Sequence, residues 1–200
     1  MTLVNFGALV AGARSGKLVS FPTDTVPALA VRPDRGADIF TVKQRSPDKP
    51  LILMAATWRD FLPFIDTNYA EIWSWEKTAQ KYFAGAITLV LPASDRGCAL
   101  NQGFDTLGIR IPNDQLAIAI LQQTGAMLTT SANKSNQPPL RRMLDISNEF
   151  PDVFTLGDGL DTSVQLGGGM PSTVVQWTAQ GWIIHRQGSV NFLEIENTGF

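Results

Sequence analysis

Cysteine and histidine are almost absent from this sequence, which contains one of each in 200 residues. Cys98 has no second cysteine with which to form an internal disulfide. The local sequence suggests no histidine paired with it, so we expect an inert or incidental thiol. Together with His185 it is too little for a Cys/His zinc site, and we predict no metal bound by protein side chains alone. His185 stands in the apolar run WIIHR, a pattern more typical of a core residue than of a catalyst.

A basic excess and a long apolar run are also missing. The formal net charge is −2, which argues against a protein that binds nucleic acid mainly by neutralising phosphates. No stretch approaches the roughly 18 apolar residues of a membrane span. The first residues lack the basic and apolar regions of a signal peptide. We therefore expect a cytoplasmic protein that does not contact a membrane.

Three common catalytic or nucleotide-binding motifs do not occur. The Walker pattern Gly-x4-Gly-Lys-Ser/Thr is absent, and no G-x-G-x-x-G follows the first predicted strand. The G-x-S-x-G nucleophile elbow is absent too. A P-loop, a dinucleotide-binding fingerprint and an α/β-hydrolase are thereby excluded.

What the sequence does contain is an alternation of strand-like apolar runs and helix-like segments. Strands are predicted at 18–22, 51–56, 87–93, 106–112, 126–133, 167–177 and 181–189. Helices are predicted at 2–15, 36–45 and 114–125, with two more between 58 and 83. This alternation predicts one α/β domain over residues 1–200, built around a mixed sheet.

Four polar clusters stand at the ends of predicted strands, where open α/β sheets bind ligands. They are PTDT at 22–25, KQRSPDKP at 43–50, TTSANKS at 129–135 and GGGMPST at 167–173. Lys43 and Arg45 can converge on one anion, or they can be a solvated helix end favoured by the helix dipole. The hydroxyl and amide groups of TTSAN can bind phosphate or simply form a turn.

Arg110 interrupts an apolar strand, and a buried guanidinium needs an anionic or multi-acceptor partner. That partner is either a ligand or the carboxylate of a structural salt bridge. Asp24 of PTDT is either a base or a turn-forming residue. The glycines of GGGMPST can hold an anion with their backbone N–H groups.

Taken in order, seven segments resemble the YrdC/Sua5/TsaC family of threonylcarbamoyl-AMP synthases, in its short single-domain form. They are SFPTDTVPALA, KQRSPDKPLILMAA, AGAITLVLPA, TLGIRIP, TTSANKSNQPP, PSTVV and IIHRQGS, and they cover residues 20–188. The resemblance implies a YrdC-like twisted mixed sheet flanked by helices, with a large, concave, positively lined cavity.

The resemblance also implies an activity. Members condense L-threonine, bicarbonate and ATP, with Mg²⁺ accompanying ATP, into threonylcarbamoyl-adenylate and pyrophosphate. The product serves N6-threonylcarbamoyladenosine formation at position 37 of tRNA, so transfer proteins of that pathway are the implied partners. A weak direct contact with tRNA is left open.

The family's functional residues fall on matching positions of this chain. The implied catalytic tetrad is Lys43, Arg45, Ser131 and Asn133, and all four also bind ATP, together with Thr106 and Arg186. The implied threonine-binding residues are Thr25, Arg110, Thr129 and Ser172. In this arrangement the threonine carboxylate is the partner of Arg110.

The sequence departs from the family pattern at several positions. Pro27-Ala28 replaces Tyr-Gly, Ser46 replaces a residue usually written as proline, and Asn136 replaces glycine. Asn tolerates the left-handed conformation, so the change at Asn136 is mild. Two alternatives therefore remain beside the synthase: a YrdC-like paralogue that binds nucleotide or RNA without synthesis, and a core protein of a tRNA-modifying assembly.

Overall fold

The computed structural model describes residues 2–192, and one mixed sheet runs through this part of the chain. The strands are β1 (Leu3–Val4), β2 (Val19–Phe21), β3 (Ala28–Val31), β4 (Ile52–Met54), β5 (Ile87–Pro92), β6 (Thr106–Arg110), β7 (Met127–Ser131), β8 (Phe154–Leu156), β9 (Thr173–Thr178) and β10 (Gly181–Arg186). Their order across the sheet is β1-β8-β2-β3-β7-β4-β6-β5-β9-β10. The pairs β1–β8, β2–β8, β4–β6 and β5–β9 are parallel, and the other neighbours are antiparallel.

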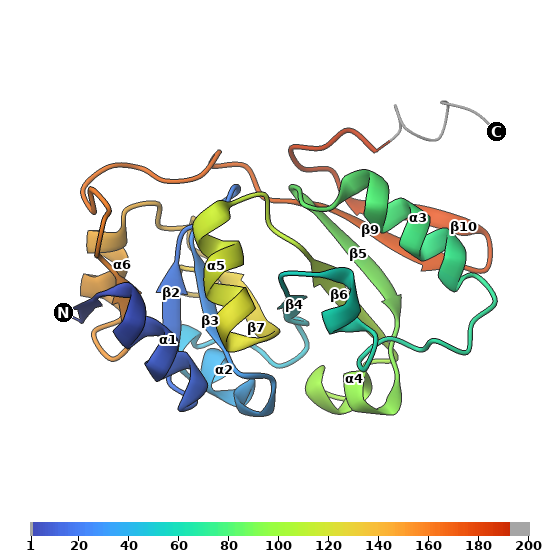
Figure 1. The fold of residues 1–200 in the computed structure, drawn as a ribbon, viewed down its shortest axis with the longest axis horizontal. Coiled ribbons are helices and arrows are strands. Elements are labelled where there is room, and N and C mark those ends of the chain that lie inside the picture. The colour runs from blue at the N-terminus through green and yellow to red at the C-terminus, as the bar shows by residue number, and fades with distance from the viewer. Residues whose placement is uncertain (1, 193–200) are drawn as a thin grey trace.

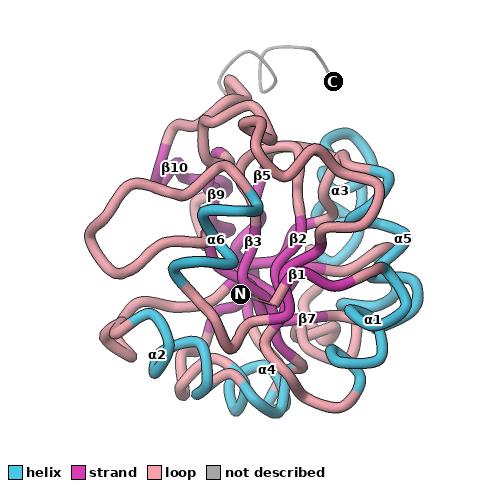
Figure 2. The backbone as a smooth tube through the Cα atoms, turned by 90° about the vertical axis from the view of Figure 1, so that its left-hand side faces the viewer, coloured by secondary structure: helices cyan, strands magenta, loops and turns pink. Residues whose placement is uncertain are grey.

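Helices cover both sides of this sheet. They are α1 (Phe6–Arg14), α2 (Ala37–Lys43), α3 (Ile72–Tyr82), α4 (Asp95–Leu100), α5 (Gln115–Thr124) and α6 (Met143–Glu149), with short 3-10 turns at Pro33–Arg35 and Trp58–Phe61. Figure 2 shows α1, α3 and α5 on one side of the strands and α2 and α6 on the other. In Figure 1, α1 and α5 lie over β2, β3 and β7, whereas α3 lies beside β5, β9 and β10. The molecule is thus an α/β layered domain, as the alternation predicted.

Side chains of the central strands alternate between a packed core and a cavity, as the two-residue period of a strand requires. Leu53, Leu89, Leu107 and Leu128 are fully buried in the core that α3 helps to cover. The neighbouring residues on the same strands face the opposite way and line a cavity; they include Ile52, Thr88, Val90, Thr106, Gly108 and Thr129. The strand period therefore separates the residues that hold the fold from those that are free to bind a ligand.

Local signals explain where the best-predicted helix lies. Asp114 caps α5 by accepting a hydrogen bond from the backbone N–H of Ala117 at 2.9 Å. The helix ends before Gly125, which has φ +76°. Both signals stand in the sequence, and α5 occupies the segment that they predict.

Several elements differ from the sequence prediction. The N-terminal helix begins at Phe6 rather than residue 2, because Leu3–Val4 pairs with β8 as a strand. The first helix predicted after residue 58 is only a 3-10 turn. The strands β3 and β8 and the helices α4 and α6 were not predicted. Residues 1 and 193–200 of the predicted domain lie outside the described residues.

Two further expectations can be compared with the structure. His185 is exposed on β10, so its assignment to the core was wrong; its Nε2 contacts Gln176 Oε1. In the described part of the chain, no helix is both long enough and apolar enough to cross a membrane.

Candidate functional site

A cavity of about 480 Å³ opens on the sheet face that the packed core leaves free. It is lined by Thr25, Arg45, Thr106, Arg110, Thr129, Ser131, Ser172 and Arg186, all of which the sequence assigned to the site. Three of these are arginines, and no carboxylate is among the described lining residues. Lys43 and Asn133 are the predicted residues that do not line it. Segments far apart in the sequence thus converge on one cavity lined by cationic side chains.

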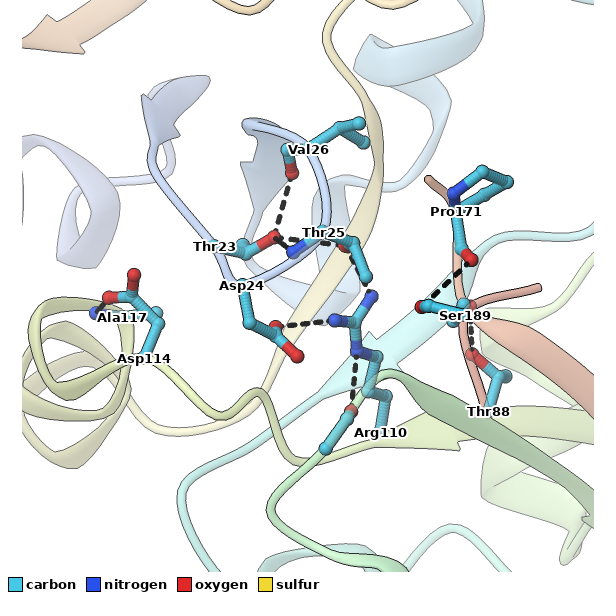
Figure 3. Close-up of polar contacts among 12 residues, drawn as sticks. Thr23, Asp24, Thr25, Val26, Thr88, Arg110, Asp114, Ala117, Pro171 and Ser189 are labelled. Carbon is cyan, nitrogen blue, oxygen red and sulfur yellow. Dashed lines mark hydrogen bonds and ion pairs between the residues drawn. The ribbon is translucent and has the colours of Figure 1, made fainter. Parts of the chain in front are cut away.

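Arg110 lies at one end of the cavity with a carboxylate already beside it (Figure 3). Its Nη2 donates to Asp24 Oδ1 at 2.5 Å, its Nη1 donates to Thr25 Oγ1 at 2.9 Å, and its Nε donates to the Gly85 carbonyl at 3.2 Å. These bonds use three of the five N–H groups of a guanidinium, which leaves donors for a ligand. The partner assigned to Arg110 from the sequence resemblance was the threonine carboxylate, but its partner in the structure is Asp24.

Burial lowers the pKa of Arg110 from its ordinary value, because only 4% of the residue is exposed. The Asp24 carboxylate opposes this shift, and the positive charge of Arg186 adds to it. The guanidinium groups of Arg110 and Arg186 therefore lie close enough to repel each other. The Asp24 carboxylate balances one of these two positive charges. An anionic ligand in this part of the cavity relieves that repulsion.

Ser172 links Arg186 to the floor of the cavity. The Ser172 carbonyl accepts from Arg186 Nη2 at 2.9 Å and Nε at 3.1 Å, and its hydroxyl lies 2.9 Å from Thr88 Oγ1. The resemblance assigned Ser172 to threonine and Arg186 to ATP, and here the two residues belong to one cluster. A carboxylate and a phosphate can therefore be neighbours at this point of the cavity.

Arg45 approaches the cavity from the loop that follows α2. Its guanidinium donates to the backbone carbonyls of Lys49 and Pro50, at distances between 3.0 and 3.2 Å. These carbonyls orient the group but do not neutralise it. Burial lowers the pKa of Arg45, and the negative charge of Asp48 opposes that shift. Arg45 is thus an oriented cation on the cavity wall.

Lys43 lies beneath the turn that follows β7 rather than in the cavity. Its Nζ contacts the Ser131 carbonyl and lies 3.3 Å from Asn133 Oδ1, which also accepts from the Ser131 hydroxyl. Burial, and then the positive charge of Arg45, lower the pKa of Lys43 from 10.5 to about 7. Asn133 also donates to the carbonyls of Lys134 and Gln137, which is the turn chemistry that the sequence left as one reading of TTSAN.

The glycine-rich segment closes over the PTDT loop. The N–H of Gly168 donates to the Asp24 carbonyl and that of Gly169 donates to the Thr25 carbonyl, both at 2.9 Å. Gly167, at φ +69°, has no room for a side chain, because a Cβ there would lie 2.4 Å from the Thr25 oxygen. Two of the N–H groups expected to hold an anion are therefore occupied by this loop, and the segment positions Asp24 and Thr25 instead.

Sequence reasoning missed part of the cavity wall. Thr23, Thr88 and Asn101 are buried polar residues that line it, and the apolar residues Val26, Leu51, Ile52, Met54, Val90 and Val174 form much of the rest. Thr88 carried a usable signal, because it is a polar residue within the apolar run of a predicted strand. Asn101 carried none, since it stands in a loop between two recognised motifs.

Metal ligands do not gather in the described part of the chain. No group of three or more His, Cys, Asp or Glu side chains is placed to hold an ion there. Asp24, the carboxylate next to the cavity, is engaged by Arg110.

Comparison with known proteins identifies the family of this chain. The Sua5/YciO/YrdC family model, described as telomere recombination, matches residues 12–188. The threonylcarbamoyl-AMP synthase of Klebsiella pneumoniae is 30% identical over 155 residues, covering 75% of this chain and 81% of the relative. The synthase of Pyrococcus abyssi is 31% identical over 189 residues, covering 92% of this chain but 54% of its own length.

Solved structures share the fold. Sua5 of P. abyssi complexed with L-threonine superimposes with a TM-score of 0.83 at 27% identity, covering 96% of this chain and 56% of that one. Escherichia coli YciO superimposes with a TM-score of 0.75 at 20% identity, which supports the fold alone. The chain belongs to the Sua5/YciO/YrdC family.

Proposed function

We propose that this chain is a threonylcarbamoyl-AMP synthase, which joins L-threonine, bicarbonate and ATP and releases pyrophosphate. The observation that carries the proposal is the single cavity in which Thr25, Arg45, Arg110, Ser172 and Arg186 meet. Its relatives of that name support the chemistry, and the cationic lining suits substrates that each carry at least one anionic group.

The amino-acid end of the cavity is the Arg110 cluster. We assign the threonine carboxylate to the N–H donors of Arg110 that the protein leaves unused, with Thr25 and Ser172 alongside. Sua5 of P. abyssi, which shares this fold, has been crystallised in complex with L-threonine, and this supports threonine as a ligand. Thr23 Oγ1 accepts from the Thr25 N–H at 3.3 Å and donates to the Val26 carbonyl at 2.7 Å, which fixes the loop that presents Thr25.

The nucleotide end lies further along β6. Thr106 and Arg110 are four residues apart on this strand, a separation of about 13 Å, which is enough to place an adenylate beside an amino acid. We assign the phosphates of MgATP to Arg45, Ser131 and Arg186, with Lys43 and Asn133 holding the turn that carries Ser131. Magnesium enters with the nucleotide and screens phosphate charge.

The chemistry needs positioning more than a protein base. The neutral threonine amine attacks the carbon of bicarbonate; the N–C bond forms, and the displaced hydroxide takes the amine proton to leave as water. A carbamate oxygen then attacks the α-phosphorus of ATP, and the bond to pyrophosphate breaks. Arginine side chains that hold both anions in contact lower the barrier by orientation and by stabilising charge on the phosphates.

Because this reaction transfers the adenylyl group of ATP, we propose that the protein is a nucleotidyltransferase. Its similarity to the synthases alone supports an enzyme of the transferase or synthase kind. Its product is consumed by proteins that transfer the threonylcarbamoyl group to tRNA adenosine, and these are the proposed partners. A nucleotide-binding paralogue without synthesis is the alternative.

Pyrophosphate release by the purified protein separates the two. With MgATP and bicarbonate present, a synthase releases pyrophosphate when L-threonine is added and little without it. D-Threonine serves as a control of equal charge. Nucleotide binding without threonine-dependent release would contradict the synthase proposal and favour the binding module.

A further inference from the structure

Asn101 carries a buried polar atom that the protein leaves without a partner. The residue is 2% exposed, and its Nδ2 donates to the Thr106 carbonyl at 2.7 Å. Its Oδ1 has no hydrogen-bond partner among residues 2–192. Because the carbonyl of Thr106 requires a donor, this bond fixes which side of the amide is oxygen. Asn101 thus presents an unsatisfied acceptor, whose burial costs about 1 to 3 kcal/mol.

The position of this acceptor points to a ligand. Asn101 lines the cavity, and its bond to Thr106 places it at the start of β6, whereas Arg110 is the last residue of that strand. Ser20 and Trp75 also have buried atoms without partners, but neither residue lines the cavity. Buried polar groups are nearly always hydrogen-bonded, so an orphan at a cavity wall is explained by a donor on the molecule that fills it.

The chemistry of the acceptor selects the part of the nucleotide that it meets. Phosphate oxygens are themselves acceptors and would be repelled by Asn101 Oδ1. The exocyclic amine of adenine is a donor only, and apolar residues of the same cavity lining, among them Pro50, Leu51 and Val90, suit a flat base.

Resting on the proposed use of ATP, we propose that Asn101 is a specificity-determining residue: its Oδ1 accepts a hydrogen bond from the 6-amino group of adenine. Guanine presents a carbonyl oxygen at this position and would leave two acceptors facing each other. A site built to bond a donor discriminates strongly against a ligand that lacks it, because the buried acceptor is then left unpaired. Asn101 therefore favours ATP over GTP.

Calorimetric titration of the wild-type protein with magnesium complexes of ATP and of purine riboside triphosphate, which lacks the 6-amino group, tests this directly. We expect ATP to bind about tenfold more tightly. Equal affinities would overturn the inference while leaving the synthase proposal intact. Failure of both nucleotides to bind would instead contradict the proposed function. A loss of affinity with 2′-deoxy-ATP but not with the purine analogue would also overturn the inference, because it would show that Asn101 contacts the ribose rather than the base.

The variant Asn101→Leu completes the comparison, since it keeps the size of the side chain and removes the acceptor. ATP and the purine analogue should bind it with affinities within twofold of each other. Asn68→Leu, an exposed change outside the cavity lining, is the matched control and should keep the wild-type preference. A preference for ATP that persists in Asn101→Leu would contradict the assignment. If Asn101→Leu does not fold, the wild-type comparison decides alone.

Discussion

Lys43 and Arg45 are two residues apart in the sequence, yet the structure gives them different surroundings. Arg45 lines the cavity, whereas Lys43 is 1% exposed and holds the turn at Ser131 and Asn133. The resemblance placed both on ATP, because a one-dimensional motif records which residues occur together and not which face they point to. At the scale of single residues, the sequence therefore predicts which residues gather around the candidate site better than it predicts the role of each one.

Replacing Arg45 by alanine should slow the proposed reaction without unfolding the chain. The guanidinium is oriented by the Lys49 and Pro50 carbonyls and supplies charge to the phosphates. Its loss should raise the barrier by about 2 to 4 kcal/mol, or about 30- to 1000-fold in rate. Steady-state pyrophosphate release measures this, with Arg59→Ala, an exposed arginine outside the cavity, as control. Wild-type turnover by Arg45→Ala would contradict the assignment.

The buried amine of Lys43 should make stability depend on pH. Its pKa is about 7 in the folded chain and near 10.5 when unfolded, so between these values the unfolded chain binds more protons and stability rises with pH. From pH 7 to pH 9, the wild type should gain about 2 kcal/mol relative to Lys43→Met. Urea unfolding at both pH values measures the difference. The exposed change Lys77→Met should follow the wild type, and a Lys43→Met curve parallel to both would refute the burial argument.

Asp24 gives a prediction that links stability to the ligand. Removing its carboxylate leaves Arg110 as an uncompensated buried charge, so Asp24→Ala should lose about 3 kcal/mol. If the threonine carboxylate binds at Arg110, it should replace the missing charge. L-Threonine should then raise the melting temperature of Asp24→Ala more than that of the wild type. An equal or smaller rise would place the carboxylate elsewhere.

At the scale of elements, apolar periodicity predicts most of the sheet. The strands β2, β4, β5, β6, β7, β9 and β10 coincide with runs that the sequence marks, because each is continuous and bounded by turn residues. The strands β1 and β8 have two and three residues, too few to show a period. β3 follows directly after Pro27, whose place in a turn-rich segment hides a fully buried strand.

The glycine-rich segment is an element whose role only the structure reveals. Gly167→Ala should disturb the site, because its Cβ would lie 2.4 Å from the Thr25 oxygen and push the loop that carries Asp24 and Thr25. A small displacement of a binding loop is costly, so KM for L-threonine should rise about tenfold or more. Gly159→Ala is a matched control in the same connection, with φ +70° and open space around the added atom.

The control separates two causes. Gly159 and Gly167 have almost the same positive φ, so both variants carry the backbone strain of alanine in that region. Only the close contacts with the Thr23 and Thr25 backbone differ between them. Equal KM values in the two variants would show that the close approach of Gly167 has no functional consequence.

At the scale of the whole molecule, a chain with net charge −2 concentrates three arginines in one cavity. The mixed sheet makes this possible, because loops from β2–β3, α2, β7 and β9 reach the same face. The net charge predicted that basic residues would bind anions only in local clusters. The alternation of strand-like and helix-like segments predicted the fold class. The cavity wall did not follow, because residues such as Asn101 are brought to it by tertiary packing rather than by a motif.

The most direct test of the central claim is the mass of the product. The purified protein should be incubated with MgATP, L-threonine and ¹³C-bicarbonate, quenched rapidly and analysed by mass spectrometry. The account predicts threonylcarbamoyl-AMP carrying one ¹³C atom, formed only when all three substrates are present. Intact ATP, or AMP without the labelled carbamoyl group, would contradict it.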